Sequence, residues 1–581
     1  MSNERQILQW LEVVSDEEQD VAGSDSEDET VNDTAIDSAH DSESEIEESE
    51  NIQDIPEPSE GNYFLSRHTQ RNGPKVKWSK VPLSKAVRTR AQNIILHLPG
   101  VKAYARNAKS PLECFQLFFD SDAIELLVTN TNLYIDKIKE KFGRDRDATS
   151  TDDTEINAFL GLLIMAGVLK GSHLNFIDLW AQDGSGVEMF RLTMSYKRFL
   201  FLLRCLRFDN TSDRAERLKI DNMAAIRYLC QIIESKFLSA YCPGENVTID
   251  EQLVGFRGRF RGKVYMPNKP NKYGIKVQAM VDSKTYYLCK FEVYSGKQPD
   301  GEYQISNSPD EIVKRLVEPI KRSGRNITTD NWYTSTKLAK ELLTPEYKLT
   351  LVGTLNKRKP DIPTEFLPNK NRPTCSSVFG FHNQMTIVSY VPKPRKAVVL
   401  LSTMHNDNAI DETTARAQKP EIITYYNSTK GGVDCNDQLC SNYNVGRRTK
   451  RWPLAVFFHL INLSGINAFV IHKANTDKSI THTRRIFLKK LAAALVEDHQ
   501  KRRIQLRAVP TTTKKRLREV HDVDETVQQS TAKRGRCSSC PRKDDKKVPT
   551  KCFKCHKFIC QQHSRVYCVG CRTEESADET D

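Results

Sequence analysis

The chain lacks the features of an exported or membrane-spanning protein. Its first 20 residues, MSNERQILQWLEVVSDEEQD, are acidic and contain no sustained apolar run, so we expect no secretory signal. The longest apolar stretch, PLAVFFHLINLSGINAFVI at 453–471, is interrupted by one His, two Asn and one Ser. This polarity favours a buried core helix over a membrane span. We therefore expect no membrane partner.

Basic residues are almost absent from the first 60 residues, which contain 21 Asp and Glu and a single Arg. Apolar residues are scarce there as well and show no periodicity, so we predict an acidic disordered region over residues 1–100. The other 521 residues carry a net charge of +32. An acidic head and a basic body are typical of proteins that bind nucleic acid, although surface lysine also increases solubility.

Disulfides are not expected in an unsecreted chain, so the 15 cysteines indicate thiols and metal ligands. Seven cysteines lie between 537 and 571, in the pairs CSSC, CFKC, CQQH and CVGC. The candidate ligands are Cys537, Cys540, Cys552, Cys555, Cys560, His563, Cys568 and Cys571. Eight such ligands make two tetrahedral Zn²⁺ sites.

Only four residues follow the second pair and four follow the third, which is too short a spacing for two independent zinc ribbons. We therefore predict a cross-brace in which the first pair binds zinc with the third and the second pair with the fourth. His556 lies outside this pairing, and we expect it at the surface. RING and plant-homeodomain modules also cross-brace two zincs, but their histidine is the fourth or fifth ligand, whereas here it is the sixth.

Along the middle of the chain, a helical pattern of apolar residues gives way to short strands that alternate with helices. Apolar residues recur at helical spacing from 110 to 245 and again over 452–474. Between 246 and 356 the pattern predicts three strands, a helix, a strand, a helix and a strand. The predicted strands are 246–250, 274–282, 286–294, 326–330 and 348–354, and the predicted helices are 309–321 and 335–343. This order indicates an α/β sheet with an antiparallel start. Residues 357–425 are strand-prone and interrupted by proline, as in a β-rich insertion.

Acidic residues follow two of these strands and begin a later helix. Asp250 ends ENVTID, Asp330 ends NITTD, and KGGVDCNDQL places Asp434 and Asp437 three residues apart on one helical face. A single Asp at such a position is more often a cap or a turn residue. In an RNase H-like fold, however, the first strand, the fourth strand and a later helix bring their acids to one edge of the sheet.

Converging carboxylates repel one another and usually hold cations. Ligands that are all oxygen favour Mg²⁺ or Mn²⁺. Two such ions can activate a water or a 3′-hydroxyl and stabilise the leaving oxygen of a phosphodiester. The cluster therefore predicts two Mg²⁺ or Mn²⁺ ions at Asp250, Asp330 and Asp434.

Two basic runs could hold the phosphates of a nucleic acid near these metals. The first contains Arg257, Arg259, Arg261, Lys263, Lys269 and Lys272, and the second contains Arg447, Arg448, Lys450, Arg451 and Trp452. A solvated turn would also explain the first run. Trp452 could stack on an unpaired base or belong to the core.

Six sequence blocks resemble those of piggyBac-type DNA transposases, in that family's order. The blocks are TIDEQLVGFRGR, PNKPNKYGIK, RNITTDNWYTS, YKLTLVGT, YYNSTKGGVDCNDQLCS and RWPLAVFFHLIN. The resemblance extends over about 110–571 and implies that Asp250, Asp330 and Asp434 are the catalytic aspartates. Asp437 matches a further acid of the motif. The ligand order at 537–571 resembles the family's carboxy-terminal cysteine-rich domain, which binds transposon-end DNA.

The resemblance implies an α/β RNase H-like catalytic domain with a β-rich insertion, flanked by a helical dimerisation and DNA-binding domain and a C-terminal cross-brace zinc domain. After the acidic head at 1–100, the predicted parts are the helical domain at 101–245 and 444–510, the catalytic domain at 246–356 and 421–443, the insertion at 357–420, a basic linker at 511–536 and the zinc domain at 537–571.

The resemblance implies a nuclear cut-and-paste transposase that acts on double-stranded DNA as a homodimer or larger assembly. It would bind terminal inverted repeats, excise the element through DNA hairpins and insert it at TTAA. KKRLR at 514–518 and KRGR at 533–536 fit nuclear-import signals or a merely basic linker. The alternatives are a domesticated DNA-binding or chromatin protein without transposition activity and, with less support, a ubiquitin ligase that uses the zinc module.

Overall fold

The computed structural model describes residues 36–37, 46–47, 61–67, 76–82, 95, 97–171, 174–477, 483–523, 534–544, 546–552 and 555–565. The chain forms two compact units, Met1–Arg502 and Arg503–Asp581. The predicted domain boundaries inside the first unit stay predictions.

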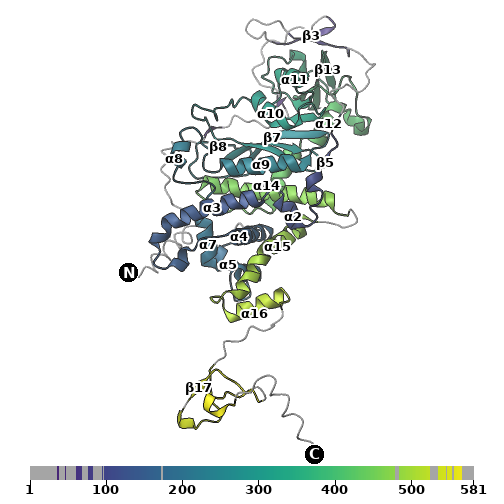
Figure 1. Cartoon of the computed structure of the whole chain (residues 1–581). Coiled ribbons are helices and arrows are strands. Elements are labelled where there is room, and N and C mark those ends of the chain that lie inside the picture. The colour runs from purple at the N-terminus through teal and green to yellow at the C-terminus, as the bar shows by residue number, and fades with distance from the viewer. Residues whose placement is uncertain are drawn as a thin grey trace, which may run out of the picture. The chain divides into compact units, whose positions relative to one another are not determined.

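Five strands with RNase H-like topology form the centre of a larger sheet in the first unit (Figure 1). These strands are β7 (Asn246–Gly255), β9 (Tyr273–Asp282), β10 (Leu288–Val293), β11 (Asn326–Thr329) and β12 (Thr350–Thr354). Their spatial order is β10-β9-β7-β11-β12, with β7, β9 and β10 antiparallel and β7, β11 and β12 parallel. Helix α10 (Pro309–Val317) connects β10 to β11, and α11 (Thr336–Leu342) connects β11 to β12. The predicted order of elements is confirmed. Strand β8 (Lys263–Tyr265), which pairs with β9, was not predicted.

The β-rich segment after β12 continues the same sheet. Strand β15 (Lys396–Ser402) pairs antiparallel with β12, and β14 (Met385–Lys393) and β13 (Ser377–His382) follow outward. The segment predicted as an insertion therefore pairs through its backbone with β12 and belongs to the same sheet.

The N-terminal region contributes structure that the sequence did not predict. Strands β3 (Tyr63–Leu65) and β4 (Lys77–Ser79) pair with each other, and β4 pairs with β13. Trp78 is fully buried, and its indole Nε1 donates to Asp361 O at 3.1 Å. The prediction of disorder throughout residues 1–100 is therefore wrong for these strands, because aromatic side chains there pack on the insertion. The short strands β1 (Ile36–Asp37) and β2 (Ile46–Glu47) pair with β8 and β15.

Some helices pack on the sheet, and further helices pack on these and enlarge the hydrophobic core. Figure 1 shows α9 and α14 on the side of β7 opposite to α10, with α3, α4 and α7 beyond α14. The helices outside the sheet region are α2 (Pro111–Gln116), α3 (Ser121–Ile138), α4 (Asp153–Val168), α5 (Phe176–Leu179), α6 (Glu188–Thr193), α7 (Tyr196–Cys205), α8 (Arg214–Arg217), α9 (Arg227–Ala240), α14 (Trp452–Asn475) and α15 (Arg484–Gln505). A two-stranded sheet, β5 (Gly100–Val101) and β6 (Tyr241–Cys242), joins the segments that flank this helical region. Caps start several helices, since Ser110, Asp120, Asp152 and Ser195 each accept a backbone N–H of the first turn.

Helix α14 is long and apolar enough to cross a membrane by length and composition, yet 83% of its most apolar window is buried inside the protein. Its polar residues have partners in the core. Asn467, for example, accepts the backbone N–H of Leu288 at 2.9 Å and donates to the same residue's carbonyl at 2.9 Å. The prediction of a buried core helix is confirmed.

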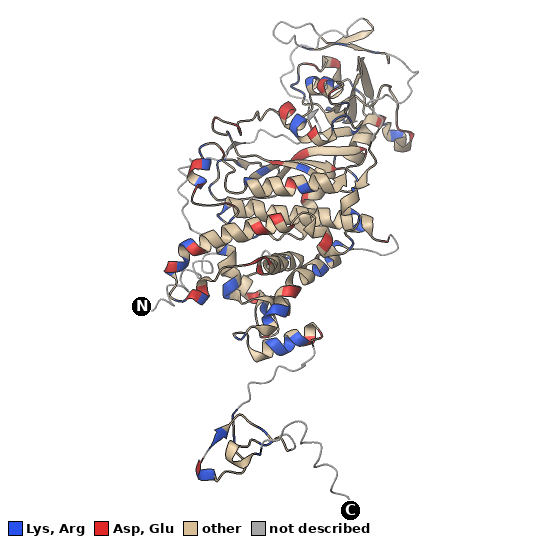
Figure 2. Ribbon diagram, in the orientation of Figure 1, with Lys and Arg blue, Asp and Glu red and all other residues tan. Residues whose placement is uncertain are grey.

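The second unit contains α16 (Thr511–Val520) and a short hairpin of β16 (Gly535–Arg536) and β17 (Lys547–Val548). Figure 2 shows Lys and Arg concentrated on α16. Little apolar surface is buried here, since Ile504, Leu517, Cys537 and Cys560 are its only buried apolar residues among those the structure describes. A unit with so small a core depends on other bonds for its stability.

Candidate active site

Asp250 lies in the middle of β7, beside Asp330, which directly follows the end of the parallel strand β11. Strand β7 continues to Gly255, beyond its predicted end at residue 250. Ile249 on β7 is paired with Thr329 on β11, so the aspartates that follow them are also neighbours. Adjacent strands lie about 4.8 Å apart, which brings the two carboxylates within reach of a shared cation. Asp330 Oδ1 accepts the backbone N–H groups of Trp332 at 3.1 Å and Tyr333 at 3.4 Å, which fixes its orientation.

Asp250 faces the helices that follow the insertion, α12 (Glu421–Thr429) and α13 (Gly432–Asn442). The residues two before and two after it make hydrogen bonds to these helices. Thr248 Oγ1 donates to Thr429 O at 2.7 Å, and Gln252 Nε2 donates to Asn436 Oδ1 at 2.8 Å. Because side chains alternate along a strand, Asp250 lies on the same face as Thr248 and Gln252.

Asp434 and Asp437 lie in the first turns of α13, beside this face. Gly432 packs against Thr248 and Asn436 binds Gln252, so the helix runs along β7 and Asp434 stands level with Asp250. The Asp434 side chain is 68% exposed, and Asp437 is half-buried. The structure therefore brings the four predicted acids to one region, with Asp434 on its solvent side.

The electrostatics of this region favour a cation. Burial raises the pKa of Asp250 well above its usual value, and the charges of Glu251 and Asp330 raise it further. Burial also raises the pKa of Asp437, against the lowering effect of Lys269. Clustered carboxylates with raised pKa values are the arrangement that a divalent ion relieves, and an all-oxygen donor set suits Mg²⁺ or Mn²⁺. These residues therefore fit the predicted metal.

The raised pKa of Asp250 predicts a pH-dependent stability. The folded protein holds this proton more tightly than the unfolded chain, so the stabilisation is present at low pH and is lost as pH rises above the unfolded value of about 3.9. In buffer free of Mg²⁺ and Mn²⁺, Asp250→Asn should therefore be more stable than wild type at pH 7.5. Thermal unfolding measured from pH 5 to 8 should show this difference shrinking as pH falls. A constant difference would contradict the buried-carboxylate assignment.

A chain of buried polar residues fixes α13 on the sheet. Asn436 Nδ2 donates to Tyr286 O at 2.8 Å, and His459 Nε2 of α14 lies 3.1 Å from Gln252 Oε1. Burial lowers the pKa of His459 to about 4, so this histidine is neutral near pH 7. Sequence reasoning missed these positioning residues, because a polar residue inside a helix or strand gives no signal of its partner.

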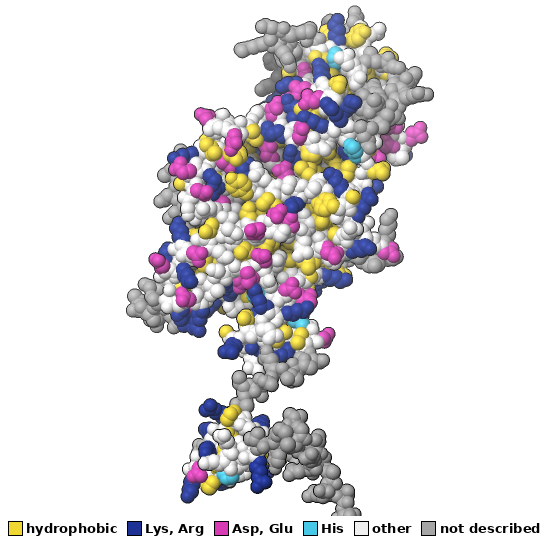
Figure 3. Space-filling view, viewed as in Figure 1, with side chains coloured by type: hydrophobic (Ala, Val, Ile, Leu, Met, Phe, Trp, Pro, Cys, Tyr) yellow, Lys and Arg dark blue, Asp and Glu magenta, His cyan; other side chains and the backbone are white. Residues whose placement is uncertain are grey.

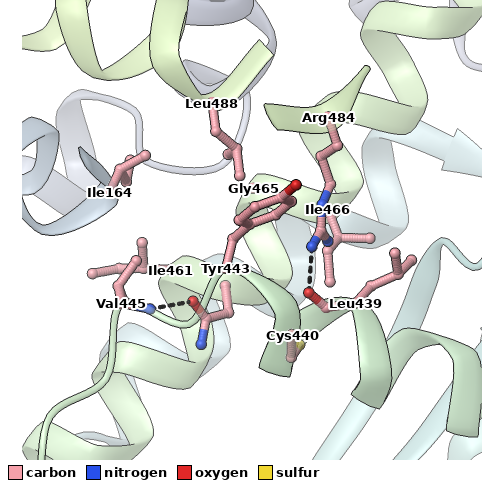
Figure 4. A pocket seen from close by; sticks show the side chains of 11 residues that line it. Ile164, Leu439, Cys440, Tyr443, Val445, Ile461, Gly465, Ile466, Arg484 and Leu488 are labelled. Carbon is pink, nitrogen blue, oxygen red and sulfur yellow. Dashed lines mark hydrogen bonds between the residues drawn. The ribbon is translucent and has the colours of Figure 1, made fainter. Parts of the chain in front are cut away.

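A basic side chain of α15, Arg484, contacts the C-terminal end of α13 (Figure 4). The guanidinium of Arg484 donates to Leu439 O and lies 4.9 Å from the Tyr443 ring, beside a small cavity. A cation at a helix C-terminus satisfies unpaired carbonyls and interacts favourably with the helix dipole. Arg484 therefore helps to set the position of the helix that carries Asp434.

The close approach of α13 to β7 requires Gly432. A Cβ atom there would lie 2.4 Å from Thr248 Oγ1 and 2.9 Å from Thr248 Cβ, and this hydroxyl is already bound to Thr429. Gly432→Ala should therefore destabilise the protein by about 1–3 kcal/mol, measured by thermal or denaturant unfolding. Gly431→Ala is the matched control, because its added Cβ would meet only Cys435 Sγ at 3.8 Å. Equal effects of the two variants would contradict this packing.

The two basic runs lie side by side, although nearly 190 residues separate them. A Cβ on Gly258 would lie 2.6 Å from Lys450 O, and the rings of Phe260 and Trp452 stack at 4.5 Å. The side chains of Arg257, Arg259, Arg261, Lys272, Arg448 and Lys450 are exposed. Arg261 also donates to Asn222 Oδ1 at 3.1 Å.

Three side chains of the second basic run pack against or hydrogen-bond with other parts of the protein. Trp452 is only 6% exposed and stacks on Phe260, so the core alternative is correct and its predicted base-stacking role is wrong. Arg447 lies 4.0 Å over the Phe176 ring and donates to Leu174 O at 2.5 Å. Arg451 donates to three carbonyls at the end of α7, those of Leu203, Arg204 and Leu206. These two guanidinium groups hold helical segments together, and their predicted contact with DNA stays a prediction.

The first and third cysteine pairs come together as the cross-brace predicts. The ligand atoms of Cys537, Cys540, Cys560 and His563 all lie within 4.8 Å of one another. Cys540 Sγ is 3.6 Å from Cys560 Sγ and 3.5 Å from His563 Nδ1. Tetrahedral Zn²⁺ places such ligands about 3.5–3.8 Å apart, so this donor set fits zinc.

The second predicted zinc site is only partly described. Cys552 and Cys555 lie in the described part, whereas Cys568 and Cys571 lie outside the described residues. His556 is exposed, as predicted. Lys and Arg side chains gather on the visible face of this unit (Figure 3).

Comparison with known proteins identifies similar chains. The family model described as Transposase IS4 matches residues 110–469. Human PiggyBac transposable element-derived protein 3 is 24% identical over 425 residues, which cover 67% of this chain and 65% of that protein. Human PiggyBac transposable element-derived protein 5 is 22% identical over 384 residues, 63% of this chain and 71% of that protein. The chain thus spans just under two thirds of the first of these relatives.

A solved structure is similar over most of the chain. The cryo-EM structure of the piggyBac transposase synaptic complex with hairpin DNA matches with a TM-score of 0.69 and 37% sequence identity. The match covers 82% of this chain and 100% of that one.

Proposed function

This chain belongs to the Transposase IS4 family, in its piggyBac-type branch, and from that membership we propose that it is an active cut-and-paste DNA transposase. It binds the terminal inverted repeats of a transposon, excises the element by metal-dependent strand hydrolysis and hairpin formation, and integrates it at TTAA sites. The observation that carries this proposal is the position of Asp250 and Asp330 directly after the paired residues Ile249 and Thr329 of two parallel strands, next to the helix that carries Asp434.

The chain's own residues position the reaction. Asp250, Asp330 and Asp434 would hold two Mg²⁺ or Mn²⁺ ions, with Asp437 close to them. When bound, such ions activate a water or 3′-hydroxyl and stabilise the leaving oxygen. The backbone N–H groups that bind Asp330 and the contacts of α13 with β7 keep these carboxylates in place before metal binds.

The exposed members of the two basic runs supply the DNA contacts near this site. Arg257, Arg259, Lys272, Arg448 and Lys450 are exposed, and the contact of Gly258 with Lys450 makes the two runs one basic surface. Phosphate contacts of this kind hold a duplex in register and weaken with salt. Cleavage should therefore be steeply salt-dependent.

The zinc module would bind two Zn²⁺ ions and recognise transposon-end DNA, acting in the nucleus in a homodimer or larger assembly. The geometry of Cys537, Cys540, Cys560 and His563 supports the first ion. The basic side chains on this unit suit a polyanionic partner. The related structure is a synaptic complex with DNA, which supports assembly on DNA.

A domesticated DNA-binding protein without transposition activity is the second candidate. The human relatives are described as derived from piggyBac elements, and such a chain could keep the fold without the reaction. All four acidic positions of the motif are present here, which favours the first candidate.

The test is strand cleavage by the purified full chain with Mg²⁺, on a duplex that carries the inverted repeats flanking the gene. Cleavage at the repeat ends, followed by joining of 3′-hydroxyls at TTAA, is expected. Specific binding of these ends without any cleavage in Mg²⁺ or Mn²⁺ would overturn the active transposase in favour of the domesticated alternative.

A further inference from the structure

A lysine side chain already lies among the carboxylates of the candidate active site. Lys269 belongs to the loop between β8 and β9, which is closed by hydrogen bonds from Met266 N to Lys272 O at 2.8 Å and from Lys269 N to Met266 O at 3.2 Å. Asn271 of the same loop packs against Gly255, where a Cβ would lie 2.7 Å from Asn271 Nδ2. The loop is thereby fixed over the end of β7.

The ammonium group of Lys269 bridges the strand and the helix that carry the acids. Nζ donates to Glu251 O on β7 at 3.1 Å and lies 3.8 Å from Asp434 Oδ1 on α13. The Lys269 side chain is only 16% exposed. Burial lowers its pKa, but the charges of Asp250, Glu251, Asp434 and Asp437 raise it above the usual value.

This placement differs from that of the neighbouring basic residues. Lys272, three residues later on the same loop, is exposed, as are Arg257 and Arg259. The nearby carboxylates partly neutralise the charge of Lys269, which leaves it less available to a DNA phosphate than the charge of an exposed residue. Lys269 instead balances negative charge on the same acids that a divalent ion would bind.

We propose that Lys269 is a resident counter-ion of the carboxylate cluster, which competes with a divalent ion for Asp434 and withdraws when that ion binds. The inference rests on the proposed metal-dependent function. It explains how the metal-free cluster remains folded despite its repulsion. It also makes Lys269 a positioning residue that sets metal affinity and, once withdrawn, becomes available to the phosphates of bound DNA.

The test is Mn²⁺ binding to the zinc-loaded full chain, measured by isothermal titration calorimetry without DNA. Lys269→Gln should bind Mn²⁺ about tenfold more tightly than wild type, since one competing charge is removed at a partly exposed site. Lys269→Arg keeps the charge and should stay within about twofold of wild type. Lys272→Gln removes a charge from the same loop outside the cluster and should also change the affinity by less than about twofold.

Labelling of the wild-type protein provides a readout that does not depend on the variants folding. Acetylation of amines, followed by mass spectrometry, should modify Lys269 several-fold faster with saturating Mn²⁺ than without it, while Lys272 reacts equally in both. Equal or weaker Mn²⁺ binding by folded Lys269→Gln, or a metal-independent labelling rate for Lys269, would overturn the inference alone. Mn²⁺ binding that is absent from wild type, or that persists unchanged in Asp250→Asn, would overturn the proposed metal site together with the inference.

Discussion

Replacing Asp330 by Asn should reduce cleavage of transposon-end DNA by about a thousandfold or more, because the proposed metal site would lose a charged ligand. The fold should survive this change. Asp330 Oδ1 accepts the backbone N–H groups of Trp332 and Tyr333, and an Asn side-chain oxygen can accept both. The measurement is the single-turnover rate of strand cleavage in Mg²⁺, with the melting temperature as a check of folding.

Asp411→Asn is the matched control for this variant. Asp411 Oδ1 also accepts a backbone N–H two residues later, that of Thr413 at 2.9 Å, but in the insertion and away from the four acids. The two substitutions therefore make the same chemical change at the same kind of turn. Asp411→Asn should retain the wild-type cleavage rate within about twofold, as surface substitutions usually do. A folded Asp330→Asn protein that cleaves as fast as Asp411→Asn would show that the catalytic assignment is wrong.

The proximity of the acids in the candidate site could be predicted, because the order of the strands brings them together. Short apolar runs ending in Asp250 and Asp330 predicted strands, and the order of elements predicted that these strands would be neighbours. The observed register of β7 with β11 agrees with both steps. The family resemblance drawn from the same blocks is confirmed as well. The order of the strands and the positions of the acids can thus be read from short segments of a single sequence.

The direction of the basic side chains could not be predicted in this way. Arg447, Arg451 and Lys269 look like phosphate ligands in the sequence, yet their groups bind backbone carbonyls or face carboxylates. Trp452 likewise packs on Phe260, which lies far away in the sequence. The partner of each of these side chains depends on which distant segment of the chain packs beside it. A local sequence pattern carries no information about that segment. Strand β4 was missed for the same reason, since Trp78 needs the insertion to bury it.

The largest structural effect should come from the zinc module, through His563→Ala. His563 Nδ1 lies 3.1 Å from Cys560 Sγ and 3.5 Å from Cys540 Sγ, within the four-ligand cluster. Structural Zn²⁺ contributes about 10–16 kcal/mol to the folding of small modules, and this unit buries few apolar residues that could replace it. Zinc content measured by inductively coupled plasma mass spectrometry should fall from two ions per chain to one or none. Affinity for transposon-end DNA should fall by about tenfold or more as the module unfolds.

His556→Ala separates zinc ligation from a general effect of losing an imidazole. His556 is exposed and lies between the second and third pairs, so this variant should keep both ions and its affinity for DNA. Combining Cys537→Ser with His563→Ala tests the cross-brace itself, because a sequential pairing would place the first zinc on Cys537, Cys540, Cys552 and Cys555 and leave His563 for the second. Under the cross-brace, Cys537→Ser and His563→Ala remove the same ion and their effects on zinc content do not add. Two additive losses would overturn the pairing, even if each variant alone loses zinc.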